Sequence, residues 1–170
     1  MWFVIWTTTG SENKLCQWIN EFMPHELYDN CFVPMVDKNM KVRGNWITKK
    51  KVLFPGYLFV NTDRDRIKEI ALWLKKAEQF AVVLSTDGIF SAVAEDEAFI
   101  IDSAFDNEGT LGTSVGFIEG GNVKILSGPL IGKEAIIKSI DRHKRLAIIE
   151  LNMFGRKSSV KIGLEIISKS

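Results

Sequence analysis

The stretch Val52-Leu53-Phe54-Pro55-Gly56-Tyr57-Leu58-Phe59-Val60 combines three aromatic side chains with no charge. If its backbone is extended, side chains alternate between two faces, with Tyr57 and Phe59 on one and Phe54, Gly56, Leu58 and Val60 on the other. Both faces are then apolar, as in a central strand covered on both sides. Pro55 cannot donate a ladder hydrogen bond, however, and Gly56 has no side chain to pack. The alternative is an aromatic surface used for binding.

The composition is that of a globular protein. The chain has 170 residues, 46% of them hydrophobic and 25% charged, which suits one domain or two small ones. No apolar run reaches the ~18 residues that span a bilayer, and the N-terminus lacks the features of a signal peptide. These observations predict a soluble, cytoplasmic protein without a membrane association.

Charge is segregated along the chain, although the net charge is only +1. The segment from Lys38 to Lys51 has six basic residues and no acidic one, whereas Ala77 to Thr113 has eight acidic residues and no basic one. From Ser114 onward there are ten basic residues and five acidic ones. Basic patches at two places are what nucleic-acid contact requires, and solvated loops are the alternative explanation.

The first hundred residues alternate strand and helix patterns. Strands are predicted at 2–7, 28–35, 52–60 and 80–84, with a hairpin or loop in the basic segment. Thr9 and Glu12 have capping-box spacing and predict a helix whose apolar stripe is Leu15, Trp18, Ile19 and Phe22. Asn61-Thr62-Asp63 offers caps for a second helix, with the stripe Ile67, Ile70, Ala71 and Leu74. A short acidic helix over 96–104 is expected to turn Phe99 and Ile100 inward.

The remaining residues change in character. Residues 106–117 are rich in Gly, Thr, Ser and Asn and predict an interdomain linker. After them, short apolar runs at 123–125, 135–140, 146–151 and 160–162 are separated by turn residues, which is typical of a small β-barrel. The whole pattern predicts an α+β fold, with an antiparallel sheet flanked by helices followed by a small all-β barrel.

Catalytic chemistry finds little support in the sequence. His25 and His143 are the only histidines, and neither has a neighbour at metal-ligand spacing. Cys16 and Cys31 form no CxxC motif and are interpreted as reduced core residues. No phosphate-binding glycine motif occurs. The sequence therefore predicts a binding protein with no catalytic residue, no metal and no cofactor.

Three stretches in order resemble the NusG family of transcription elongation factors. Residues 52–60 resemble the family's most characteristic strand. Residues 2–7 with 10–14 resemble its opening strand and the start of its first helix, and 128–132 with 154–156 resemble its KOW module. The resemblance implies an NGN-type domain over residues 1–105, a flexible linker over 106–117 and an SH3-like KOW domain over 118–170.

The resemblance also implies partners. The family's aromatic strand packs on the clamp helices of RNA polymerase, and the matching positions here are Trp2, Phe54, Tyr57 and Phe59. Phe154 matches the tip that the family presents to a NusE-type ribosomal protein or to Rho; a place in the barrel core is the alternative. Ala135 stands where the KOW pattern has glycine, a departure similar to that of specialised paralogs of the LoaP or RfaH kind.

The basic residues point to phosphate contacts, because a clamp-helix binder does not need them. The candidates are Lys41, Arg43, Lys49, Lys50, Lys51, Arg64, Arg66, Lys68, Arg142, Lys144, Arg145, Arg156 and Lys157. The first hypothesis is a monomeric elongation and antitermination factor that binds polymerase and is recruited by a nascent RNA hairpin or by non-template DNA. The alternatives are a free-standing RNA-binding module and a general NusG that links polymerase to Rho or the ribosome.

Overall fold

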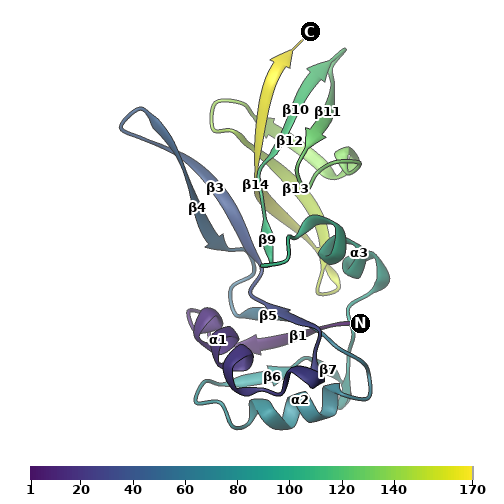
Figure 1. Ribbon diagram of the computed structural model, residues 1–170. Helices are drawn as coiled ribbons and strands as arrows, with labels where there is room; N and C mark the ends of the chain where they lie inside the picture. The colour runs from purple at the N-terminus through teal and green to yellow at the C-terminus, as the bar shows by residue number, and fades with distance from the viewer. Residues whose placement is uncertain (170) are drawn as a thin grey trace. The chain divides into compact units, whose positions relative to one another are not determined.

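The computed structural model describes residues 1–169, with side chains up to Ser168. The chain forms two compact units that are interleaved along the sequence (Figure 1). The first unit contains Met1–Pro34 and Phe54–Ala98, and the second contains Met35–Leu53 and the chain from Phe99 onward. Each unit is built around its own sheet. The α+β fold predicted from the sequence is confirmed.

The first unit holds an antiparallel sheet of order β2-β5-β1-β6. Its strands are β1 (Trp2–Thr7), β2 (Asn30–Phe32), β5 (Tyr57–Asn61) and β6 (Ala81–Val83). A small hairpin, β7 (Ser85–Thr86) with β8 (Ile89–Phe90), and the 3₁₀ turn η1 (His25–Leu27) complete its extended and turn elements. The predicted strand over 28–35 is interrupted, because Pro34 follows β2 and cannot donate to a ladder.

Two helices belong to this unit. Helix α1 (Glu12–Phe22) packs against β2 and β5, and α2 (Ile67–Leu74) packs against β6. Leu15 and Ile19 of α1 are fully buried as predicted, whereas Trp18 is half-buried and Phe22, the last residue of the helix, is exposed. In α2 the predicted stripe is buried at Ile67, Ile70 and Leu74.

The start of α1 differs from the predicted capping box. Helix α1 begins at Glu12, and its N-cap residue, Ser11, makes no side-chain capping bond. The buried carboxylate of Glu12 instead accepts hydrogen bonds from the backbone N–H groups of Gly10, at 2.8 Å, and Gly56, at 2.6 Å. Glu12 therefore ties the helix start to the turn that precedes β5.

That turn corrects the prediction that residues 52–60 form one strand. The Tyr57 N–H donates to the Phe54 carbonyl at 3.1 Å, which closes a four-residue turn with Pro55 and Gly56 at its centre. Gly56 has φ +88°, the conformation that a type II turn requires at its third position. Strand β5 starts only at Tyr57, so the alternation of faces does not extend back to Phe54.

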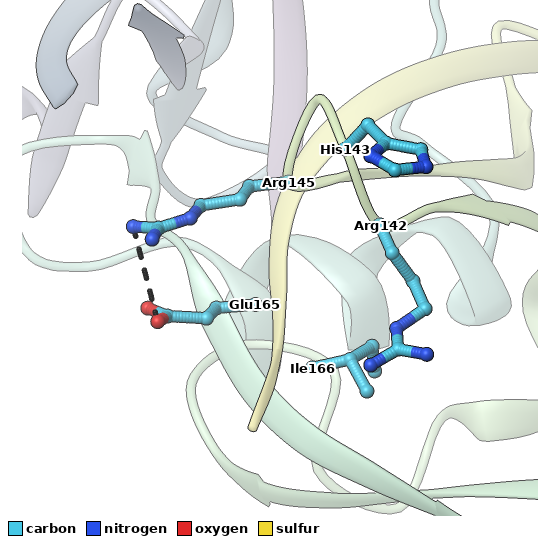
Figure 2. Close-up of a pocket in the computed structure, with 5 residues that line it drawn as sticks. All are labelled: Arg142, His143, Arg145, Glu165 and Ile166. Atoms are coloured by element: carbon cyan, nitrogen blue, oxygen red, sulfur yellow. Dashed lines mark ion pairs between the residues drawn. The ribbon is translucent and has the colours of Figure 1, made fainter. Parts of the chain in front are cut away.

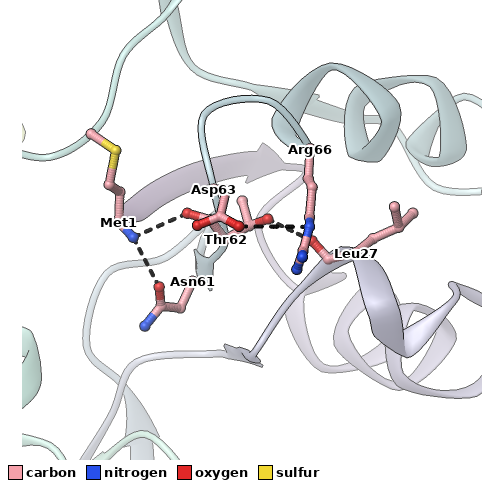
Figure 3. A network of polar contacts seen from close by, with 6 residues as sticks. All are labelled: Met1, Leu27, Asn61, Thr62, Asp63 and Arg66. Atoms are coloured by element: carbon pink, nitrogen blue, oxygen red, sulfur yellow. Dashed lines mark hydrogen bonds and ion pairs between the residues drawn. The ribbon is translucent and has the colours of Figure 1, made fainter.

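A polar network joins the start of β1 to the end of β5 (Figure 3). The terminal amine of Met1 donates to the Asn61 side chain at 3.1 Å and to the Thr62 carbonyl at 3.0 Å. The Thr62 hydroxyl donates to the Leu27 carbonyl, and Thr62 is buried. Asp63 forms an exposed ion pair with Arg66 at 3.6 Å. The network fixes the chain just before α2.

The second unit contains a long hairpin in the basic segment. Its strands are β3 (Met35–Val42) and β4 (Asn45–Val52), and β3 also pairs in parallel with β9 (Thr110–Leu111). Arg43 and Gly44 form the two-residue turn, with φ of 49° and 82°. Positive φ at both positions is typical of the type I′ turn, whose twist suits a hairpin.

The barrel part of this unit is a sheet of order β11-β10-β14-β13-β12. The strands are β10 (Ser114–Glu119), β11 (Asn122–Ser127), β12 (Ile137–Asp141), β13 (Leu146–Met153) and β14 (Arg156–Lys169), with a 3₁₀ turn η2 (Glu134–Ile136) before β12. Its core includes Leu130, Ala147, Ile149, Leu151, Ile162 and Leu164. Residues 106–117, predicted as a linker, contain β9 and the first part of β10. The predicted domain boundaries stay a prediction.

Helix α3 (Glu95–Ala104) lies where the acidic helix was predicted. Its buried apolar residue is Ile101, whereas Phe99 is exposed. The expectation that Phe99 and Ile100 turn inward was therefore displaced by one position, since a stripe in a short helix has few repeats to fix its phase. Within residues 1–169, no helix is both long and apolar enough to cross a membrane.

Candidate functional site

The two faces of the β2-β5-β1-β6 sheet carry different side chains. Directly paired residues of antiparallel strands share a face, and Val4 pairs with Phe59 while Trp6 pairs with Tyr57. One face, called here the aromatic face, therefore carries Trp2, Val4, Trp6, Phe32, Tyr57, Phe59 and Val82. The other face carries Phe3, Ile5, Cys31, Leu58, Val60 and Val83. Helix α1 lies on this second face, because the Cys16 thiol is hydrogen-bonded to the side chain of Cys31, which points to that face.

The middle of the aromatic face is a cluster of rings around Phe59. The Phe59 ring lies 5.8 Å from Phe32, 6.3 Å from Phe54 and 6.4 Å from Trp2, between ring centroids and at steep angles. Phe59 has no exposed surface, and Trp2 and Phe54 are also buried. The sequence predicted all three as polymerase contacts. In this structure they are interior side chains, because their rings pack on one another.

The exposed part of the aromatic face was missed by sequence analysis. Trp6 and Phe80 are 47% and 52% exposed, and their rings meet edge to face at 5.3 Å. Val82, paired with Trp6 across β1 and β6, is also exposed. Tyr57, the remaining predicted contact, is half-buried opposite Trp6. The signal was the alternation of β1, in which Trp6 shares a face with Trp2 and Val4.

The β3–β4 hairpin sorts its lysines between two faces. Lys38 pairs with Lys49 and Val36 with Lys51, so Lys38, Lys49 and Lys51 share one face, called here the lysine face. Like charges directly opposite each other repel, and a bound anion would relieve that repulsion. Lys50 lies on the other face, opposite Asp37, and its ammonium is 3.5 Å from the Glu108 carboxylate. The three consecutive lysines therefore lie on two faces of the hairpin, Lys49 and Lys51 on one and Lys50 on the other.

The remaining predicted phosphate contacts of the first unit and the hairpin are exposed. Lys41 is on β3 and Arg43 occupies the hairpin turn. Arg64, Arg66 and Lys68 surround the start of α2, although Arg66 is engaged with Asp63. Exposure satisfies one requirement for phosphate contact without testing the prediction.

The barrel gathers two of its predicted cationic residues. Arg142 and Arg145 line one pocket together with His143, Glu165 and Ile166 (Figure 2). Lys144 is exposed in the same turn, 3.9 Å from Asp141. Arg156 and Lys157 lie at the other end of β13 and β14, where Lys157 is 3.7 Å from Glu150. The structure thus brings together part of the predicted basic set and separates the rest.

Phe154 occupies a turn. With Gly155 it connects β13 to β14, and the two residues have φ of 57° and 70°. The side chain is half-buried, whereas Leu151 and Met153 of the preceding strand are buried in the barrel. Phe154 therefore lies at a hairpin tip, outside the row of β13 core residues.

The two cysteines form a pair between α1 and β2. A hydrogen bond with the Cys31 thiol lowers the pKa of Cys16, and the same bond together with burial raises the pKa of Cys31. Burial raises the pKa of the neighbouring Tyr28 to about 12. Both cysteines are free thiols; Cys31 is buried, as predicted for a core residue, whereas Cys16 is half-buried. Among residues 1–168 no group of three His, Cys, Asp or Glu side chains is placed to hold a metal.

Comparison with known proteins addresses the resemblance directly. The family described as "Transcription termination factor nusG" matches residues 1–106, which is more than half of the chain. The chain belongs to the NusG family. The KOW motif matches residues 119–151.

Individual NusG proteins are distant relatives. "Transcription termination/antitermination protein NusG" of Thermus thermophilus is 24% identical over 189 residues, covering 99% of this chain and 98% of the relative. Its Helicobacter pylori (strain J99) counterpart is 22% identical over 168 residues, covering 95% and 93%. A solved structure described as "Domain interaction in Thermotoga maritima NusG" is similar in fold, with a TM-score of 0.50, 20% identity and coverage of 97% and 93%. Membership of the NusG family identifies a transcription elongation and termination factor.

Proposed function

We propose that this NusG-family protein binds the clamp helices of RNA polymerase through the aromatic face and makes elongation processive. The exposed Trp6–Phe80 pair carries the proposal. Two large rings in edge-to-face contact give a rigid apolar anchor, and aromatic residues dominate the binding energy of many interfaces. Val82 extends this exposed surface along β6, and Tyr57 adds a polar hydroxyl beside it.

The buried ring cluster supports the same surface from within. Trp2 of β1, Phe32 of β2 and Phe54 all pack on Phe59 of β5. Trp6 and Tyr57 therefore lie on a well-packed sheet. A surface that is already ordered loses less conformational entropy on binding. The role proposed for Phe59 and Trp2 is therefore positioning rather than direct contact.

Processivity follows if clamp binding favours one state of the polymerase. A factor that binds the closed clamp more tightly than the open one shifts the population toward the closed, elongating state. The shift cannot exceed the difference between the two affinities. Antitermination is the expected result when this shift acts at a terminator.

Nucleic-acid contact is proposed for the lysine face and the basic residues around α2. The supporting observation is the cross-strand pair Lys38–Lys49, two like charges that a phosphate would bridge. A structured hairpin of the nascent RNA is the proposed target, and exposed non-template DNA is the competing one. The alternative function, RNA binding without polymerase, uses this surface alone and leaves the aromatic face without a role.

A pause-escape assay tests the proposal. Stalled elongation complexes of bacterial polymerase are released with and without the protein, and the lifetime of a defined pause is measured. We expect the protein to shorten the pause and Tyr57→Ala to remove most of that effect, with polymerase affinity lowered by about 2 kcal/mol. An unchanged effect in a folded Tyr57→Ala variant contradicts the assignment. RNA binding with no binding to polymerase supports the alternative function.

A further inference from the structure

The pocket in the second unit lies between the turn after β12 and the end of β14 (Figure 2). Its volume is about 430 Å³, and it is lined by Arg142, His143, Arg145, Glu165 and Ile166. Small-molecule sites have volumes of roughly 300–1,000 Å³, so a nucleotide has enough room. Its lining thus combines two guanidinium groups, one imidazole, one carboxylate and one apolar side chain.

Arg145 is held in place by its neighbours. Its guanidinium carbon lies 4.4 Å from the centre of the Trp46 ring, a cation–π contact with the hairpin. Its backbone carbonyl accepts a hydrogen bond from Leu164 N–H at 3.0 Å, which joins the turn to β14. These contacts order the cationic side of the pocket before any ligand arrives.

The carboxylate of Glu165 retains its capacity to accept hydrogen bonds from a ligand. Its Oε1 is 3.8 Å from Nη1 of Arg145, which is longer than a hydrogen bond. Electrostatic attraction nevertheless keeps the guanidinium of Arg145 and the carboxylate of Glu165 next to each other. Figure 2 shows Arg142 and Ile166 on the opposite side of β14 from Arg145 and Glu165.

Among the RNA bases, guanine matches this arrangement. Its Watson–Crick edge presents two adjacent donors, N1–H and N2–H, which one carboxylate can accept together. Its O6 and N7 accept a bidentate arginine. Adenine and cytosine offer one amino donor beside an acceptor, and uracil offers a single N3–H between two acceptors, so each leaves a charged partner unsatisfied.

We propose that this pocket binds an unpaired guanine of single-stranded RNA. Glu165 accepts from N1–H and N2–H, and Arg145, whose Nη1 is 3.8 Å from that carboxylate, donates to O6 and N7. Arg142, on the opposite side of β14, contacts the adjoining phosphate. Sequence-specific proteins read unpaired RNA bases in this way, by hydrogen bonds to the base edges. This assignment rests on the RNA contact proposed above and names the base that the barrel selects.

The test compares labelled octamers by fluorescence anisotropy. The probes are eight uridines and the same octamer with one central guanosine, adenosine, cytidine or inosine. We expect the guanosine probe to bind about 10-fold more tightly than the adenosine, cytidine and all-uridine probes. Inosine lacks the 2-amino group, so its octamer should fall between the guanosine and uridine probes.

Glu165→Gln separates base recognition from charge. Removal of a negative charge strengthens the binding of every probe if only electrostatics act. Loss of an acceptor instead weakens guanosine binding and removes the difference between guanosine and inosine. Glu150→Gln is the matched control, because Glu150 is in the same barrel and pairs with Lys157 at a similar distance of 3.7 Å. It should retain the full guanosine preference.

Several outcomes overturn the proposal. Equal affinity for the five probes does so, and so does a guanosine preference that survives in Glu165→Gln. Displacement of the guanosine probe by polyglutamate but not by GMP assigns the pocket to an acidic protein segment instead. Polymerase binding is measured in parallel on the same variants. Absence of a guanosine preference in the unmodified protein, with polymerase binding intact, contradicts this inference alone, whereas guanosine preference without polymerase binding contradicts the proposed function alone.

Discussion

The aromatic face of the first unit and the lysine face of the hairpin are both formed by antiparallel strands, but they differ in how their side chains divide between core and solvent. On the aromatic face, Phe59 is fully buried while Trp6, on the neighbouring strand, is 47% exposed. On the lysine face, Lys38, Lys49 and Lys51 are all exposed. An apolar side chain can serve as core or as surface, whereas an unpaired lysine stays in water. The first surface should bind with little salt dependence and the second with strong salt dependence.

The largest effect is expected at the buried end of the aromatic face. Phe59→Ala removes the ring at the centre of the cluster and should lower the free energy of unfolding by about 3–5 kcal/mol. Urea denaturation measures this loss. Phe22→Ala, at a phenylalanine that is 56% exposed, is the control and should change stability by about 0.5 kcal/mol or less. Equal losses in the free energy of unfolding for the two variants would contradict the assignment of Phe59 to the core and Phe22 to the surface.

The exposed end of the same face should show the opposite behaviour. Trp6→Ala should weaken polymerase binding by about 2 kcal/mol, or roughly 30-fold, while the protein remains folded. Titration against polymerase at two salt concentrations measures the loss and its weak salt dependence. Leu72→Ala, at an exposed apolar residue of α2, is the control. If Trp6→Ala binds polymerase as well as the unmodified protein, the aromatic face is not the docking surface.

If the lysine face contacts phosphates, its lysines should contribute to the salt dependence of RNA binding. Replacement of Lys38, Lys49 and Lys51 by alanine should reduce the slope of log affinity against log salt by about 2, since each single-stranded phosphate contact contributes roughly 0.7. Affinities measured between roughly 50 and 200 mM salt give the slope. A triple alanine variant at Lys14, Lys75 and Lys76 carries the same change in net charge. An equal loss of slope in both variants would mean that only net charge matters.

The smallest effect is expected at Lys50, the neighbour of two lysine-face residues. Because Lys50 points to the other side and lies 3.5 Å from Glu108, Lys50→Ala should leave the salt slope nearly unchanged. The matched comparison is Lys49→Ala, which should reduce the slope by about 0.7. A larger effect at Lys50 than at Lys49 would reverse the assignment of the two hairpin faces.

The same contrast explains what the sequence could predict. The periodicity of α1 and α2 is local, so the helices follow from residue order. The basic segment was predicted as a hairpin or a loop, and the structure forms a hairpin with its turn at Arg43–Gly44. The α+β class follows from the order of the predicted strands and helices along the chain. Position 54 was assigned to the wrong face because the turn at Pro55–Gly56 resets the alternation, although proline and glycine had already indicated a problem there.

The site required contacts between distant residues. Phe59 and Trp6 are both aromatic strand residues, and only the packing of Phe32 and Trp2 decides which is core. Glu12 looked like a capping residue, yet its partner Gly56 lies far along the chain. The pocket joins a turn at 142–145 to residues 165 and 166 of β14, a pairing that no local pattern predicts.

The interleaving of the two units has a consequence for synthesis. The chain leaves the first unit at Pro34 and returns at Phe54, so the β3–β4 hairpin emerges from a ribosome before β5, α2 and β6 exist. A hairpin closes in about 1–10 μs, whereas ribosomes add roughly 5–20 residues each second. The hairpin therefore waits for seconds with open edges before its neighbours are made. Lysines along such edges discourage pairing with other chains, so the charges proposed to meet RNA also protect the nascent protein from aggregation.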